Sequence, residues 1–140
     1  MYVLDTNVVS ELRKAAKANA SVRAWASSVS VNAMYLSAVT VLELETGVLL
    51  AERRDPPQGS VLRQWLDTQV LPTFSRRVLS FDSVVARRCA HLHVPDPRSE
   101  RDAMIAATAI IHGMSVVTRN VSDFAPTGVH IVDPWTTARP

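Results

Sequence analysis

The alternation of short apolar segments with longer amphipathic segments constrains the fold of this chain more than any other feature. Five apolar runs have the length of strands, at residues 2–4, 34–37, 78–81, 115–118 and 129–132. The segments between them change to a helical period, at residues 21–28, 41–54, 60–70, 83–93 and 101–112, with DPPQG separating the second of these helices from the third. Strands separated by helices predict an α/β fold with a parallel sheet that is covered on both faces.

The composition is that of an ordinary globular protein. A length of 140 residues predicts a single domain over residues 1–140. The net charge of +2 is too small to identify a nucleic-acid binder. No apolar run reaches the roughly 18 to 20 residues of a membrane span, and the N-terminus lacks the basic segment of a signal peptide. We therefore expect a cytoplasmic protein with no membrane partner.

Polar side chains follow the first expected strand at the point where it ends, in the sequence VLDTN. Asp5, Thr6 and Asn7 come directly after the apolar residues. Such residues commonly form turns where a strand gives way to a helix. In an open parallel sheet, however, ligands bind beyond the carboxyl ends of the strands. Asp5 therefore marks the edge of the sheet where a functional site is expected.

Two more acids are expected to return to this edge. Glu43, in YLSAVTVLELETG, is expected in the first turn of the helix that leaves the second strand. Asp102 begins a helix that a tight link joins to the fourth strand. This helix must run antiparallel to that strand, so its N-terminus lies at the carboxyl edge. The sequence TRNVSDF begins where the fourth strand ends and adds Thr118, Asn120 and Asp123 to the same edge.

Helix capping is the alternative interpretation of these acids. Thr40 and Glu43 have the spacing of a capping box, and Ser99 and Asp102 form a weaker version of it. Capping does not explain why three carboxylates converge, because their mutual repulsion is unfavourable without a cation. Carboxylate and amide oxygens are hard donors, so they favour Mg²⁺ or Mn²⁺ over zinc. A divalent cation at this edge indicates phosphodiester hydrolysis.

Four ordered motifs, LDTN, TVLELETG, RDAMIAATA and VTRNVSDF, closely resemble those of PIN-domain ribonucleases, in particular the VapC-type toxins of bacterial toxin–antitoxin pairs. The DPW sequence near the end and the segment SAVTVLELETGV are most similar to the FitB branch. The resemblance implies a five-stranded parallel sheet in the order 3-2-1-4-5 and a Mg²⁺-dependent site that cleaves RNA. It also implies a homodimer and a cognate VapB-like antitoxin. A transfer RNA is the substrate that the family suggests.

The resemblance also assigns the acids. Asp5, Glu43 and Asp102 match the three acids of the family and are expected to bind the metal and to be catalytic. Asn120 stands where many relatives have a fourth acid, and an amide supplies an oxygen without a charge. Either Asn120 holds a metal-bound water or Asp123 takes the fourth position. One or two metal ions fit this pattern.

Other polar residues are expected to support the acids or to bind RNA. Thr6 and Thr118 would orient the acids through their hydroxyl groups, and Asn7 would brace the turn. Simple turn formation is the alternative for these three residues. Arg101 and Arg119 are weaker candidates for contacts with the RNA phosphates.

The expected helical hairpin at 41–70 carries more apolar residues than one buried face requires. We expect part of it to be buried in a homodimer or under an antitoxin segment. The alternative is that all of it packs on the core of its own chain. The residues in question are Val48, Leu49, Leu50, Leu62, Trp65 and Leu66.

Two functions of different class fit the sequence. The first is a metal-dependent endoribonuclease toxin that an antitoxin holds inactive. The second is a weakly cleaving or non-cleaving PIN-like dimer that acts with a DNA-binding partner as a corepressor or scaffold. The three intact acids favour the first function, and the resemblance to the FitB branch, together with Asn120, keeps the second open.

Overall fold

The computed structural model describes residues 1–136, and within this range five strands form one parallel sheet. The strands are β1 (Tyr2–Leu4), β2 (Met34–Ser37), β3 (Val78–Leu79), β4 (Ser115–Val117) and β5 (Ile131–Val132). Their order is β3-β2-β1-β4-β5, and all four pairings are parallel. The predicted fold class and strand order are therefore confirmed.

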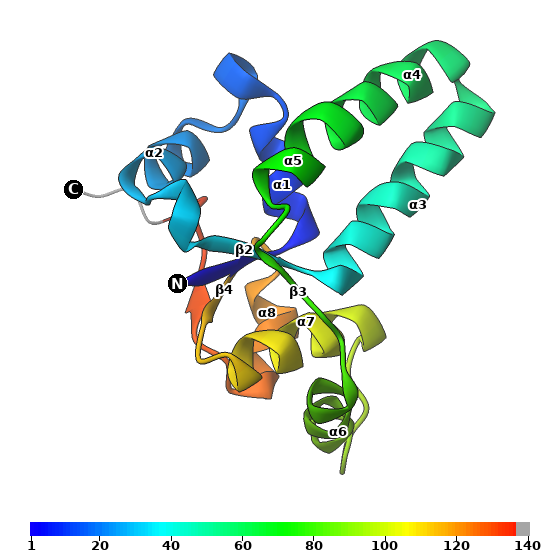
Figure 1. Cartoon of the computed structure of the whole chain (residues 1–140). Coiled ribbons are helices and arrows are strands. Elements are labelled where there is room, and N and C mark those ends of the chain that lie inside the picture. The colour runs from blue at the N-terminus through cyan, green and yellow to red at the C-terminus, as the bar shows by residue number, and fades with distance from the viewer. Residues whose placement is uncertain (137–140) are drawn as a thin grey trace.

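Helices cover both faces of the sheet (Figure 1). One layer contains α1 (Thr6–Leu12), α2 (Ala20–Ser28), α3 (Ala38–Arg54), α4 (Pro56–Trp65) and α5 (Leu71–Thr73). The other contains α6 (Ser83–Leu92), α7 (Glu100–Ile111) and α8 (Val121–Phe124). Each layer has its own apolar core against the central strands. Leu4 and Leu36 lie in the first, and Val3, Val116 and Phe124 lie in the second.

Helix α3 begins three residues earlier than expected. Ser37 is its N-cap, and the Ser37 side chain accepts a hydrogen bond from the Val39 N–H at 3.0 Å. The predicted capping box from Thr40 to Glu43 is therefore wrong, and Glu43 lies in the second turn of α3 instead of the first. Both serine and threonine are good N-caps, so the sequence pattern alone did not distinguish Ser37 from Thr40.

The DPPQG sequence begins a helix as well as ending one. Asp55 ends α3 and caps α4, because its Oδ1 accepts a hydrogen bond from the Gln58 N–H at 3.3 Å. Pro56 and Pro57 then occupy the first helical positions, where a missing N–H has no consequence. The helical path continues through a π-helical segment (Leu66–Val70) into α5.

The remaining differences lie at the ends of elements and in short helices. The third, fourth and fifth strands are each shorter than expected, and the helix near residue 101 begins at Glu100. Short helices at α1 and α8 were not expected. Other short elements are η1 (Ala15–Lys17), η2 (Val31–Ala33) and η4 (Ala125–Thr127). Among the residues that the structure describes, no helix has the length and hydropathy needed to cross a membrane.

Helices α3 and α4 form a long hairpin that extends away from the sheet (Figure 1). Arg63 of α4 binds the Glu45 carboxylate of α3 through two nitrogens, at 3.0 and 2.6 Å, and Glu52 through two more hydrogen bonds. Gly59 of α4 is buried directly against the backbone of Glu52. The two helices therefore approach closely at Gly59 and are linked by the ion pairs of Arg63 with Glu45 and Glu52.

The structure divides the apolar residues of the hairpin into a buried set and an exposed set. Val48 and Leu66 are buried in the core of the chain itself, and Leu62 and Trp65 pack partly against that core. Leu49 and Leu50 remain exposed. Leu42 and Val61 of the same hairpin are exposed as well. The alternative that all of the hairpin packs on its own core is therefore wrong, and burial of the exposed part by a partner stays a prediction.

Candidate metal-dependent nuclease site

Asp5 lies at the carboxyl end of the central strand and is buried, with 4% of its surface exposed. Its Oδ1 accepts the Thr6 N–H at 2.8 Å, and its Oδ2 accepts the Thr118 hydroxyl at 2.7 Å and the Asn7 side-chain N–H at 3.2 Å. Burial raises the pKa of Asp5, the Thr118 and Thr6 hydrogen bonds oppose the rise, and the charge of Glu43 adds to it. These contacts fix the carboxylate in one orientation.

Thr118 links the loop after β4 to the strand that carries Asp5. Its hydroxyl is buried and accepts the Asn120 N–H at 2.9 Å while it donates to Asp5. Asn7 completes the arrangement, because its Oδ1 accepts the Arg119 N–H at 3.4 Å. The structure thus places Thr118 and Asn7 beside Asp5, as their expected supporting roles require.

Glu43 faces the same edge from helix α3. Its Oε1 accepts the Thr6 hydroxyl at 2.6 Å, and its Oε2 lies 3.8 Å from Nη1 of Arg101. The contact with Thr6 joins the second acid to the N-terminus of α1, next to Asp5. Arg101, a predicted RNA ligand, is half-exposed and supplies the nearest opposite charge to Glu43.

Asp102 lies in the first turn of α7 and is partly buried. Burial raises its pKa from the ordinary 3.8 to about 6, and the negative charges of Asp5, Asp123 and Glu43 contribute. The negative charges of the three other carboxylates of the predicted site therefore all act on Asp102. Ser99 occupies the N-cap position of α7, as expected, but its side chain makes no capping hydrogen bond to the helix backbone.

The fourth position of the site contains two candidates, Asn120 and Asp123. Asn120 is exposed and precedes α8, and its side chain caps no backbone N–H of that helix. Asp123 is also exposed, but its charge contributes to the raised pKa of Asp102. The fourth negative charge near the site is therefore that of Asp123, while Asn120 is held in place through its backbone.

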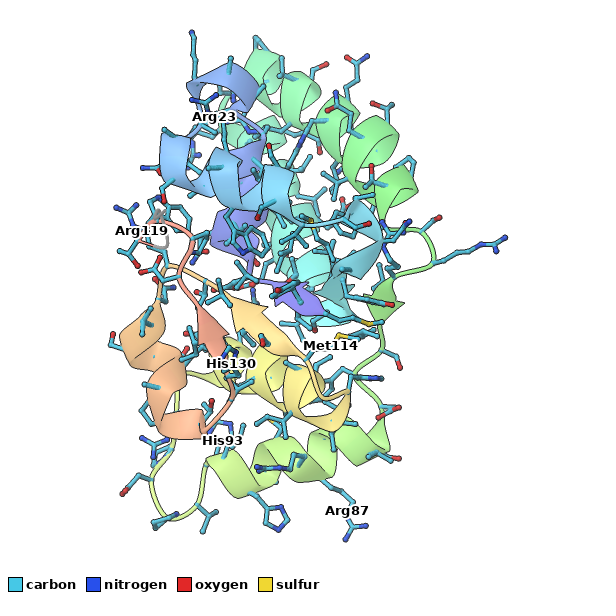
Figure 2. All side chains as sticks on the ribbon, turned by 90° about the vertical axis from the view of Figure 1, so that its left-hand side faces the viewer. Arg23, Arg87, His93, Met114, Arg119 and His130 are labelled. Carbon is cyan, nitrogen blue, oxygen red and sulfur yellow. The ribbon has the colours of Figure 1, made fainter. Side chains whose placement is uncertain are left out.

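Arg119 lies on the loop that carries this fourth position, beyond the carboxyl end of β4 (Figure 2). Its guanidinium lies 5.1 Å from the centre of the Trp135 ring. The side chain is exposed, and its positive charge acts on Glu11 of α1. Met114 and His130, which precede β4 and β5, lie toward the opposite end of these strands (Figure 2).

The acids provide a suitable donor set for a hard divalent cation. Among the residues that the structure describes, no three His, Cys, Asp or Glu side chains are grouped tightly enough to form a metal site as they stand. Asp5 is fixed, whereas Glu43 and Asp102 are partly exposed on helices. Burial is the main cause of the raised pKa values of Asp5 and Asp102, neighbouring negative charges add to it, and a bound cation would favour the ionised forms of both carboxyl groups.

A groove between α1 and the α3–α4 hairpin adjoins the acids and was not expected from the sequence. Its volume is about 330 Å³, and Glu43 lies at its lining together with the apolar side chains of Leu44 and Val48. Trp65 and Arg13 also line it, with the Arg13 guanidinium 5.9 Å from the centre of the Trp65 ring. The groove brings an apolar surface directly to the acidic edge. Its residues come from three helices, so sequence spacing gave no signal for it.

We expect Asp102→Asn to stabilise the metal-free protein at neutral pH. The folded-state pKa of Asp102 is raised, so the free energy of unfolding falls as pH rises from about 4 to 6 and stays lower above that range. A shift of this size corresponds to ~3 kcal/mol, and solvent screening of a half-exposed group reduces the expected gain to about 1 kcal/mol. Urea unfolding with EDTA at pH 4 and pH 7.5 measures it. An equal effect of the substitution at both pH values would contradict the expectation.

Three comparisons with known proteins agree with this geometry. The family model of the PIN domain matches residues 2–126. The chain is 40% identical to the VapC ribonuclease Y4jK of Sinorhizobium fredii, over 96% of this chain and 98% of the relative. It is 38% identical to the toxin FitB of Neisseria gonorrhoeae, over 96% and 99% of the two chains. A crystal structure of FitAcB from the same organism superposes with a TM-score of 0.88 at 36% identity, over 97% and 99% of the two chains.

Proposed function

Because the chain belongs to the PIN-domain family of VapC- and FitB-type toxins, we propose that it is a Mg²⁺-dependent endoribonuclease and the toxin of a type II toxin–antitoxin system. The observation that carries this proposal is the convergence of Asp5, Glu43 and Asp102 at the carboxyl edge of the sheet, where burial raises the pKa of Asp5 and Asp102 and the charges of neighbouring carboxylates add to the rise. Such a set needs a cation, and a phosphodiester is the substrate class that a hydrated Mg²⁺ serves.

Asp5, Glu43 and Asp102 would hold the ion. Bound there, Mg²⁺ supplies an activated water and stabilises the charge that develops on the phosphate oxygens. Thr118 and Asn7 keep the Asp5 carboxylate oriented, and Thr6 does the same for Glu43. A negative substrate must approach four carboxylates, so positive charge on the approach side matters.

The arginines beside the acids supply this positive charge. Arg101 is exposed beside Glu43, Arg119 is exposed on the loop that carries Asn120, and both would bind phosphates of the RNA. Recognition of single-stranded RNA also uses stacking on arginine and aromatic side chains. The Arg119–Trp135 pair offers such a surface beyond the loop that follows β4. A structured RNA such as a transfer RNA is the proposed substrate.

Partner binding belongs to the same proposal. Structures related to this chain include FitAB bound to an IR36 DNA fragment, with a TM-score of 0.89 at 35% identity, over 99% of both chains. We propose a VapB-like antitoxin whose apolar segment occupies the groove between α1 and the α3–α4 hairpin, next to Glu43. The exposed Leu42, Leu49 and Leu50 of α3 would lie in a homodimer interface or under the antitoxin.

The test is cleavage of a labelled transfer RNA by the purified, antitoxin-free chain. We expect cleavage with Mg²⁺ or Mn²⁺, its loss after treatment with EDTA, and its return when metal is added back. The Asp5→Asn protein, purified in the same way, controls for a contaminating nuclease. Failure to cleave any structured RNA at saturating metal would reject the proposal and favour the non-cleaving corepressor or scaffold.

The fourth position gives a separate prediction. Because the charge of Asp123 reaches Asp102 while Asn120 carries none, Asp123→Asn should lower the cleavage rate at low Mg²⁺ by about tenfold, or ~1.4 kcal/mol of barrier. Asn120→Asp would then crowd two carboxylates and lower the rate as well. Rates across a Mg²⁺ titration distinguish the two residues. A faster Asn120→Asp protein with an unchanged Asp123→Asn protein would assign the fourth position to Asn120 instead.

A further inference from the structure

Thr40 carries a buried hydroxyl that nothing in the chain explains. The residue has 0% of its surface exposed, and within the described part of the chain its Oγ1 has no hydrogen-bond partner. The capping role that its sequence position suggested belongs to Ser37. Buried polar groups are almost always paired, and an unpaired one destabilises the folded state. This hydroxyl is therefore available to a partner that is not part of the protein.

The position of Thr40 on α3 defines the direction of its side chain. Val39, the preceding residue, packs in the same apolar cluster as Ile105 of α7. Leu44, one turn further along, packs in the same cluster as Val8 of α1. At 100° per residue, Thr40 lies between these two directions. Its buried side chain therefore faces the space between α1 and α7, at the carboxyl end of the central strand.

This space is where the acids meet. Asp5 caps the N-terminus of α1, and Asp102 lies in the first turn of α7. Glu43 is three residues after Thr40 on α3, so the two side chains share one face of the helix. Glu43 also bonds the Thr6 hydroxyl next to Asp5. The unpaired hydroxyl therefore belongs to the face of α3 that carries Glu43, and α3 contacts both α1, which follows Asp5, and α7, which carries Asp102.

We propose that Thr40 is a positioning residue of the metal site, whose hydroxyl binds a water in the hydration shell of a divalent cation held by Asp5, Glu43 and Asp102. This inference rests on the proposed metal dependence. A hydroxyl has one donor and two acceptor positions, so it can accept a hydrogen bond from a water that a cation polarises. Mg²⁺ keeps several waters when carboxylates bind it. Groups that hydrogen-bond to the ligands of a metal ion, without touching the ion, change the affinity of the site.

Thr40→Val tests the inference because valine keeps the shape and removes the hydroxyl. In EDTA we expect the melting temperature to rise by about 3 °C, since an unpaired buried polar group is lost. We expect the affinity for Mn²⁺, and for Mg²⁺, to fall by about tenfold in a calorimetric titration. Stability and metal affinity should therefore change in opposite directions, which a purely structural role for Thr40 would not produce.

Thr40→Ser is the matched control because it keeps the hydroxyl and removes a buried methyl group. Its melting temperature should fall, while its metal affinity should stay within about twofold of the wild type. Equal metal affinity in the wild type and in Thr40→Val would overturn the inference and leave the proposed function intact. A serine variant as weak as the valine variant would also overturn it. A wild-type chain that binds neither cation would overturn both the inference and the metal-dependent function.

Discussion

Asp5→Asn is expected to reduce RNA cleavage by on the order of 10²- to 10³-fold, the loss typical when one preorganised electrostatic group is removed. Asp5 is the acid whose orientation the structure fixes most completely, through Thr6, Asn7 and Thr118. Asparagine has the same shape, keeps one oxygen for the Thr6 N–H and removes the charge that a cation needs. The measurement is the single-turnover cleavage rate at saturating Mg²⁺.

The fold should survive this substitution. Burial raises the pKa of Asp5, so loss of the charge favours the metal-free fold and offsets part of the cost of placing an amide N–H where Oδ2 accepted the Thr118 hydroxyl and the Asn7 side-chain N–H. Asp133→Asn is the matched control. Asp133 is an acid directly after β5, at the same edge of the sheet, and its Oδ1 accepts the Trp135 N–H. We expect near wild-type cleavage from Asp133→Asn, and a similar rate from Asp5→Asn would exclude Asp5 from the site.

The sequence contained enough information to place the acids at one edge of the sheet, and the reason is topological. In a parallel α/β fold, a residue directly after a strand and a residue at the start of a helix that returns to the next strand share the carboxyl edge. Asp5 and Asp102 satisfy these two conditions, and both lie where the spacing predicted. The order of the strands came instead from the resemblance to a known family, because spacing alone does not determine which strands are neighbours.

The errors have a different origin, since they depend on contacts that no local pattern contains. Ser37 and Thr40 are both suitable N-caps, and the choice of Ser37 follows from its burial at the end of β2. Helix α1 has only seven residues, which is too short for its period to be read. The π-helical segment after α4 shifts the register of the helix there, and residue propensities give no sign of such a shift.

The approach of α3 and α4 at Gly59 leads to the largest expected effect on stability. A Cβ atom at this position would lie 2.3 Å from the Cα and 2.5 Å from the backbone N of Glu52. These are backbone atoms, so the helices must move apart to admit even one methyl group. Overpacking of this kind costs about 3 kcal/mol, which exceeds the roughly 1 kcal/mol that alanine gains over glycine in a helix. We therefore expect Gly59→Ala to lower the free energy of unfolding by about 2 kcal/mol in urea titrations.

Gly47→Ala is the control that separates steric effects from helix propensity. Gly47 is an exposed glycine inside α3 of the same hairpin, and a Cβ there would meet no atom within 4 Å. Alanine should therefore stabilise the protein by about 0.5 to 1 kcal/mol, because only the propensity gain remains. The two alanine variants should thus differ in the sign of their effect. If both were stabilising, the hairpin would tolerate a wider separation at Gly59, and the close approach of α3 and α4 would not be required for stability.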